Sequence, residues 1–273
     1  TVTFDEAFTL DIAEEKTGLT FVGYYILGTD TCIATYNKNI KTLNYTSNTW
    51  VWDDGKDWVQ TKDTAATLLV EQRYSRNEYV VTVKTTTDSL DSDGKYVVKT
   101  ETKKFTYDRN FDNLAVPKKQ GYDFGGYKVT GGTYDGEIIW DTQGTKTKDT
   151  WLWAENLTVE AVWTPKTYTV KYAKGSFTIT YDEGIPKVDG DGKAGHTFKG
   201  YVLPSDLGGA KVFDTSGKPT TALWRYDIGA NGTEIMLSSQ FDINYYTVVV
   251  DYEGEFPEER LGTMYGAQSG KIT

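Results

Sequence analysis

Cysteine, histidine and methionine are scarce in this sequence of 273 residues, which holds one, one and two of them. The single thiol, Cys32, has no partner in the chain, so no internal disulfide can hold the fold. One histidine and one cysteine also exclude a metal site built from these residue types, and we expect no cofactor. The sequence contains no run of 18 apolar residues, so we expect no segment inserted into a membrane.

Basic residues are outnumbered as well, because 29 Lys and Arg stand against 39 Asp and Glu, for a net charge of −10. An acidic surface repels phosphate backbones, which argues against nucleic acid as a partner. Helical periodicity is rare along the chain, whereas aromatic residues make up 14% and threonine is frequent. Aromatic and β-branched side chains suit pleated, half-buried surfaces, so the composition predicts a mainly β protein.

A repeated frame of seven residues, G-x-x-F-x-G-Y, spans residues 18–24, 121–127 and 195–201. Fourteen positions before each frame, a strand-like stretch ends in an aromatic residue: Phe4, Tyr107 or Tyr181. Each copy later closes on another aromatic residue, and five positions further a tyrosine opens a new strand-like stretch. The closing residues are Tyr74, Trp163 and Phe241, and the opening tyrosines are Tyr79, Tyr168 and Tyr246. Fixed offsets around loops of variable length indicate rigid elements repeated in tandem.

These offsets divide the chain into four parts. Residues 1–77 form a first module that lacks its opening strand, 78–166 a second, 167–244 a third, and 245–273 the opening hairpin of a fourth, incomplete module. Two explanations fit ends that fall inside a module. The sequence is an excerpt of a longer array, or the last hairpin of one molecule completes the first module of the next by strand addition. We favour the excerpt, because proteins usually cover unpaired strand edges.

The frame itself predicts how its residues are used. Its first glycine should take a positive φ angle, and its second glycine should mark a bulge or a close backbone approach, because Phe and Tyr three positions apart would otherwise face opposite sides of a strand. Without a disulfide, a small module needs large aromatic anchors. The predicted structural core residues are Phe21, Tyr24, Tyr74, Phe124, Tyr127, Trp163, Phe198, Tyr201 and Phe241.

This ordered set of motifs resembles the Listeria–Bacteroides repeat, which is also known from the B repeat of internalin B. The second module matches best, through Gly121–Tyr127, Leu157–Pro165 and Tyr168–Val170, and the third matches through Gly195–Tyr201. The first module departs most, with Gln72–Tyr74 in place of A-x-W, and every frame has Tyr where Trp is usual. The resemblance implies tandem, β-grasp-like α+β modules in bacterial surface or secreted proteins. It implies little about an activity.

Catalytic chemistry has no support in the sequence. His196 is the only histidine, and it lies at a frame position where the other copies have Leu19 and Tyr122. An interchangeable position indicates a structural role, which removes a Ser-His-Asp triad. Carboxylates are numerous but scattered, and no pair recurs in a setting typical of a hydrolase. We therefore expect a protein that is not an enzyme.

Three Asp-Gly clusters invite comparison with calcium loops: residues 53–57, 91–94 and 189–192. None of them has the spacing of an EF-hand, because position 12 is Thr102 when counted from Asp91 and Gly200 when counted from Asp189. Turn chemistry accounts for these residues more simply. A weak calcium site of another type stays open.

Four tryptophans alternate with other residues, and a fifth, Trp58, follows a turn; these tryptophans fit either of two roles. Trp50, Trp52 and Trp58 surround an Asp-Asp-Gly turn in the first module, and Trp151 and Trp153 alternate in the second. Exposed tryptophan stacks on sugar rings, so the first group is a candidate glycan-binding site, but ordinary core packing is favoured in so aromatic a chain.

The repeats, together with the location that the resemblance implies, predict a non-catalytic stalk or adhesin segment on a bacterial exterior. Short linkers such as Thr164–Thr167 leave little slack, which favours an elongated rod of small sheet modules. Its partners would be neighbouring repeat modules of the same or adjacent chains. The alternative function is a binding module for a glycan or a host surface protein, through Trp50, Trp52 and Trp58.

Overall fold

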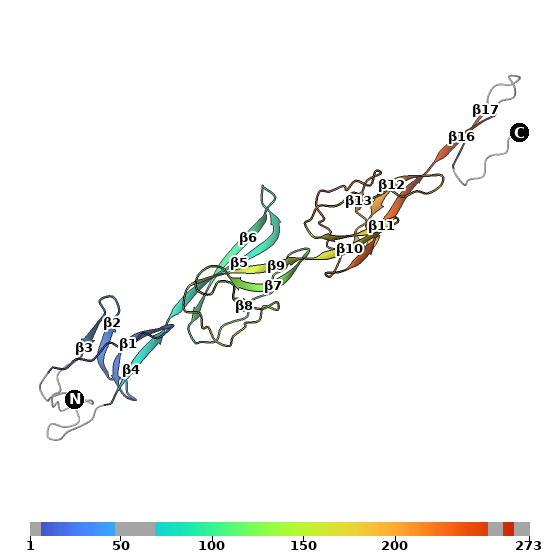
Figure 1. Cartoon of the computed structure of the whole chain (residues 1–273). Coiled ribbons are helices and arrows are strands. Elements are labelled where there is room, and N and C mark those ends of the chain that lie inside the picture. Colours follow the sequence, from blue (N-terminus) through green and yellow to red (C-terminus); the bar gives the residue numbers. More distant parts are fainter. Residues whose placement is uncertain (1–6, 47–68, 251–258, 265–273) are drawn as a thin grey trace. The chain divides into compact units, whose positions relative to one another are not determined.

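The computed structural model describes residues 7–46, 69–250 and 259–264, and these residues are mainly β (Figure 1). In this part of the chain the only helical element is a three-residue 3-10 turn, η1 (Ser205–Leu207). The chain divides into two compact units, residues 1–117 with 125–162 and residues 118–124 with 163–273. These units do not follow the module boundaries drawn from the repeat, so the four-module division stays a prediction.

A four-stranded antiparallel sheet forms the first part of the chain, in the order β3-β2-β1-β4. Its strands are β1 (Leu19–Ile26), β2 (Cys32–Asn37), β3 (Thr42–Tyr45) and β4 (Val70–Arg76). Strand β1 begins directly after Gly18, contains the rest of the first frame and lies between β2 and β4. Figure 1 shows these strands in blue, with β4 in cyan where it leads into the next sheet.

The next sheet has five strands, in the order β6-β5-β9-β7-β8. They are β5 (Glu78–Leu90), β6 (Tyr96–Thr106), β7 (Tyr122–Val129), β8 (Ile138–Trp140) and β9 (Leu157–Pro165). A hairpin opens the sheet, and its first strand, β5, pairs in parallel with the closing strand β9, Val81 lying opposite Leu157. The second frame lies on β7, which pairs with β8.

The same pairing pattern returns in the third repeat. The strands there are β10 (Thr167–Tyr172), β11 (Gly175–Thr180), β12 (His196–Val202), β13 (Lys211–Phe213), β14 (Glu234–Met236) and β15 (Ser238–Ile243). Hairpin β10-β11 has a parallel neighbour in β14, and β12, which contains the third frame, pairs with β13 and β15. Leu237 separates β14 from β15, whereas β9 is continuous. A further hairpin follows, β16 (Tyr245–Val250) with β17 (Glu259–Met264).

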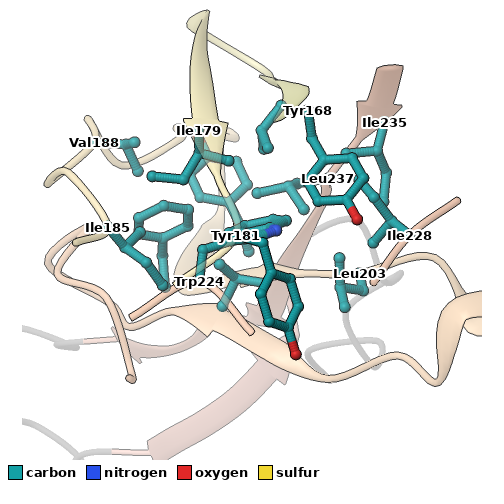
Figure 2. Packing of buried hydrophobic residues seen from close by; sticks show 14 residues of the cluster. Tyr168, Ile179, Tyr181, Ile185, Val188, Leu203, Trp224, Ile228, Ile235 and Leu237 are labelled. Carbon is teal, nitrogen blue, oxygen red and sulfur yellow. The ribbon is translucent and has the colours of Figure 1, made fainter. Parts of the chain in front are cut away.

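Aromatic rings fill the cores. Around the five-stranded sheet, Trp140, Trp151 and Trp153 are fully buried, and the Phe105 ring stacks on Trp151 with centroids 4.7 Å apart. In the second unit, Tyr168 and Trp224 lie among the aliphatic side chains that Figure 2 labels. Rings of this size bury about 150–250 Å² each, which compensates for the absent disulfide.

At the second glycine of the frame, the structure has both a β-bulge and a close approach of the neighbouring backbone, the two alternatives predicted for this position. The strand register shifts between Phe21 and Gly23 and between Phe198 and Gly200, and this bulge brings Phe and Tyr of one frame into edge-to-face contact. The ring centroids are 5.3 Å apart in the first frame and 4.9 Å in the third. A β-carbon on Gly200 would lie 2.1 Å from the carbonyl oxygen of Phe213, so the neighbouring strand leaves no room for a side chain.

Replacing this glycine should therefore destabilise the third repeat. Gly200 has a φ of 120° and Gly208 a φ of 89°, but a β-carbon on Gly208 meets nothing within 4 Å. We expect Gly208→Ala to cost about 1–2 kcal/mol, from left-handed backbone strain alone. Gly200→Ala adds a backbone collision and should cost at least about 3 kcal/mol. Denaturant unfolding of both variants measures the difference, and equal losses would contradict the close approach.

Candidate functional site

The recurring structural site of this chain lies where one repeat ends and the next begins. Strand β4 runs into β5, β9 into β10, and β15 into β16, with one residue between the strands each time. These junction residues are Asn77, Lys166 and Asn244. The closing strand and the next opening strand thus follow each other with almost no linker.

Each junction residue binds the first glycine of the frame through its backbone. The amides of Asn77, Lys166 and Asn244 donate to the carbonyl oxygens of Gly18, Gly121 and Gly195, and all three N···O distances are 2.9 Å. The junction carbonyl then accepts a hydrogen bond from the next repeat: the amide of Tyr107 donates to Asn77 and that of Tyr181 to Lys166, again at 2.9 Å.

A tyrosine ring covers the frame glycine at two of these junctions. Gly18 and Gly121 have φ angles of 71° and 73°, as the frame predicted for its first position. A β-carbon on Gly18 would lie 2.1 Å from the ring of Tyr107, and one on Gly121 would lie 2.1 Å from the ring of Tyr181. The glycine is needed here for two reasons, its conformation and the ring that lies on it.

The junction at Lys166 also contains an ion pair. The Lys166 ammonium lies 3.1 Å from Oδ1 of Asp227, which also accepts a hydrogen bond from the Tyr168 hydroxyl at 2.9 Å. The Gly121 amide donates to Oδ2 of the same carboxylate at 3.1 Å. Three donors thus converge on Asp227, whose side chain is 23% exposed, against 16% for that of Lys166.

Burial and hydrogen bonding shift the proton affinities of this cluster. Burial of Asp227 opposes its ionisation, but hydrogen bonds from Gly121, Tyr168 and Lys166 outweigh burial and lower the pKa of this carboxyl. Burial, followed by the hydrogen bond to Asp227, raises the pKa of the Tyr168 hydroxyl far above its ordinary value. The Tyr168 hydroxyl therefore stays protonated and donates a hydrogen bond to Asp227, which already accepts hydrogen bonds from Gly121 and Lys166. This arrangement is typical of a structural contact.

The junctions differ in side-chain chemistry while their backbone contacts stay the same. At the first and last junctions an asparagine replaces the lysine, and its Oδ1 accepts a hydrogen bond at 2.6 Å, from Thr20 to Asn77 and from Thr197 to Asn244. The ion pair of Lys166 is thus an addition to a contact that the backbone already makes.

The Asp that follows the covering tyrosine also has a partner. Arg76 lies 3.1 Å from Asp108 beside the first junction. Beside the second, Asp182 accepts hydrogen bonds from Arg225 and from the Tyr122 hydroxyl, both at 2.7 Å.

The frame phenylalanines and the closing aromatics meet in pairs. Ring centroids are 5.5 Å apart for Phe21 with Tyr74, 5.6 Å for Phe124 with Trp163, and 5.7 Å for Phe198 with Phe241. Among the nine predicted core residues, four are buried and five are partly buried. The buried residues are Phe21, Tyr24, Tyr127 and Tyr201, and the partly buried residues are Tyr74, Phe124, Trp163, Phe198 and Phe241.

Trp151 and Trp153 pack in the core and are not exposed for binding a sugar. Their side chains are 0% and 1% exposed, so neither can stack on a sugar. The Trp151 ring N–H donates to the Trp153 carbonyl, and that of Trp153 donates to Glu137, both at 2.8 Å. Trp50, Trp52 and Trp58 lie outside the described residues.

Of the two Asp-Gly clusters in the described segments, residues 91–94 form a turn, whereas residues 189–192 lie in an irregular segment, so the expectation of a turn is wrong for the second cluster. Oδ1 of Asp91 accepts hydrogen bonds from the amides of Asp93 and Lys95, at 2.9 Å each. Asp191 accepts from the Ser239 hydroxyl at 2.6 Å. No group of three His, Cys, Asp or Glu side chains suited to a metal ion occurs in the part of the chain that the structure describes. The cluster at residues 53–57 lies outside that part.

His196 contributes to packing in its frame. Its ring meets that of Phe241 edge to face at 6.3 Å, and its Nδ1 lies 2.8 Å from the carbonyl oxygen of Ala194.

A second repeated turn escaped the sequence analysis, although D-T-x-G marks it at residues 141–144 and 214–217. The Asp carboxylate caps the turn, and the glycine carbonyl accepts a hydrogen bond from the connection that precedes the frame. The donors are the amides of Leu114 and Val188, at 2.9 Å each. These turns hold the extended connections against the core.

No protein-family model matches this chain, and no curated protein is significantly similar to it. The likeness to the Listeria–Bacteroides repeat thus depends on the motifs and their spacing. Among the described residues, no helix is long and apolar enough to cross a membrane.

The Asp227 cluster makes stability depend on acid pH. Because the folded pKa of Asp227 lies below its unfolded value of about 3.9, its contribution is complete above that pH and is lost as pH falls through the folded pKa. We expect Asp227→Asn to lower the free energy of unfolding by about 1–3 kcal/mol at pH 7, since the pair is partly exposed.

Denaturant unfolding at pH 7 and pH 3 measures this dependence. The gap between wild type and Asp227→Asn should shrink at pH 3. Asp206→Asn, in the exposed turn η1, is the control and should stay within about 0.5 kcal/mol of wild type at either pH. A gap of equal size at both pH values would show that the ionised carboxylate is not what stabilises the junction.

Proposed function

We propose that this chain is a non-catalytic stalk or adhesin segment of a bacterial cell-surface or secreted protein. In this proposal its repeats are small β-grasp-like modules, and short junctions join them into a semi-rigid, elongated rod. The rod would hold another part of the parent protein away from the cell envelope. Its partners are neighbouring modules of the same or adjacent chains.

The observation that carries the proposal is the recurring junction. Three closing strands pass into three opening strands through a single residue, and each junction residue donates to a frame glycine over 2.9 Å. A linker of one hydrogen-bonded residue has very little conformational freedom, which is what a spacer that transmits length requires.

The strand pairing supports the β-grasp-like part. In both complete repeats the opening strand of a hairpin pairs in parallel with the closing strand of the repeat, β5 with β9 and β10 with β14. The segment between hairpin and frame is an extended connection, and it places Phe111 and Leu114 in the core of the second repeat. The extracellular location depends on the family resemblance.

Small-angle X-ray scattering of residues 1–273 tests the rod. A compact chain of this length would have a radius of gyration of about 18 Å, whereas three modules of roughly 30 Å in line give about 26 Å or more. We expect the larger value, with a maximum dimension near or above ~90 Å.

The control is a variant with a flexible Gly-Ser insertion after Lys166. It should broaden the distance distribution of the wild type. A wild-type radius near the compact value, or a wild type already as flexible as the insertion variant, would contradict the stalk.

A further inference from the structure

Strand β6 (Tyr96–Thr106) leaves one long edge of the five-stranded sheet open. It is the terminal strand in the order β6-β5-β9-β7-β8, and within the described residues it pairs only with β5. Residues 97–102 are all exposed, and the strand contains no proline. An edge of this kind presents a row of unpaired amides and carbonyls that another strand can use.

The other sheet edges around the frames are shorter. Within the described part of the chain, β8, β13 and β14 have three residues each, β3 has four, β11 and β15 have six and β4 has seven, against eleven for β6. Short edge strands are a common protection against pairing. Of these edges, β6 therefore offers the most backbone to a partner.

Three charged residues of β6 lie on one face of the sheet. In the register with β5, Lys99 lies opposite Thr85, Glu101 opposite Val83 and Lys103 opposite Val81, so the three charges share one face. Neighbouring lysines are already used: Lys104 pairs with Glu78 at 2.9 Å and Lys84 with Glu160 at 3.1 Å. None of the described ion pairs uses Lys99 or Glu101.

The geometry points to a partner for this edge: the β6 strand of a second copy of this chain, in antiparallel orientation. A two-fold axis through Thr100 would place Thr100 opposite itself and Lys99 opposite Glu101 of the second copy, twice over by symmetry. Residues 96–104 of each copy would then be paired.

The charge pattern selects among registers. With the axis at Glu101, the two Glu101 carboxylates face each other and Lys99 faces Lys103, which is repulsive at every charged position. With the axis at Lys99, the lysines face each other. An axis at Thr102 pairs Glu101 with Lys103 but leaves Lys99 opposite Phe105 and loses the pairing of Val97. The axis at Thr100 keeps the exposed Val97 and Val98 inside the paired segment.

The same charges explain why such an edge does not attract every strand. Lysines on an edge repel other basic edges and discourage indiscriminate pairing. An antiparallel partner strand can form ion pairs with both Lys99 and Glu101 only if it has a basic residue followed two positions later by an acidic one. Strand β6 itself has this pattern, in Lys99 and Glu101. The association should weaken as salt rises, because the pairs are exposed.

Charge reversal tests the contact. Glu101→Lys places Lys99 opposite a lysine, and Lys99→Glu places Glu101 opposite a glutamate, so each variant alone should be monomeric where the wild type is a dimer. An equimolar mixture of the two restores Lys–Glu pairs at both positions and should form a heterodimer. Analytical ultracentrifugation at low salt and roughly 100 µM protein suits an interface of modest area.

Two controls accompany this experiment. Lys128→Glu, an exposed residue of β7, changes the charge equally and should dimerise like the wild type. At a protein concentration low enough for the wild type to be monomeric, circular dichroism and thermal unfolding should match wild type for all variants, because the altered side chains are exposed. A monomeric wild type, dimers that survive Lys99→Glu, or a mixture that stays monomeric would each overturn the proposal.

A cysteine at the axis gives an independent measurement. Thr100→Cys in a Cys32→Ser background places two thiols opposite each other, and mild oxidation should yield a covalent dimer. Lys128→Cys in the same background should remain monomeric. Equal cross-linking of the two variants would show random collision and contradict pairing at β6.

Discussion

The contact between a frame glycine and the tyrosine that follows in the next repeat is the constraint on which this structure depends. Gly18 and Gly121 adopt positive φ angles, receive the rings of Tyr107 and Tyr181, and accept hydrogen bonds from the junction residues. A side chain at either glycine would collide with the ring. The contact joins residues on the two sides of a one-residue junction, because Tyr107 follows Asn77 in the chain and Tyr181 follows Lys166, whereas each frame glycine precedes its junction.

Aromatic packing supplies the stability that cross-links would otherwise provide. A bulge at the second frame glycine turns Phe and Tyr to one side, and the frame phenylalanine then meets the closing aromatic of its own repeat. The junction that follows begins three residues after that closing aromatic, so core packing and the position of the junction are linked. Aromatic packing of this kind compensates for the lack of an internal disulfide, because a small module cannot rely on a large apolar core.

Much of this arrangement can be read from the sequence, since local backbone requirements leave local signatures. The frame predicted the positive φ of Gly121 and the bulge that unites Phe198 with Tyr201, and the composition predicted a mainly β chain. Spacing alone could not show that Tyr107 covers the glycine of the preceding repeat, because an offset gives order along the chain and not contact in space. The ion pair of Lys166 with Asp227 was also missed, since its members lie 61 positions apart and the residue that corresponds to Asp227 in the second repeat is Ala154, which cannot form an ion pair.

The contact of Gly121 with the Tyr181 ring can be tested by comparison with a matched glycine, Gly131. Gly131 has nearly the same φ, 77° against 73°, but a β-carbon on it meets nothing within 4 Å. Both Gly→Ala variants carry backbone strain of about 1–2 kcal/mol, so their difference in free energy of unfolding isolates the collision with Tyr181. Because the Tyr181 ring leaves no room for a side chain, we expect Gly121→Ala to lose at least about 2 kcal/mol more than Gly131→Ala and to alter the NMR signals of the Tyr181 ring. Equal losses, with the Tyr181 ring undisturbed, would contradict this expectation.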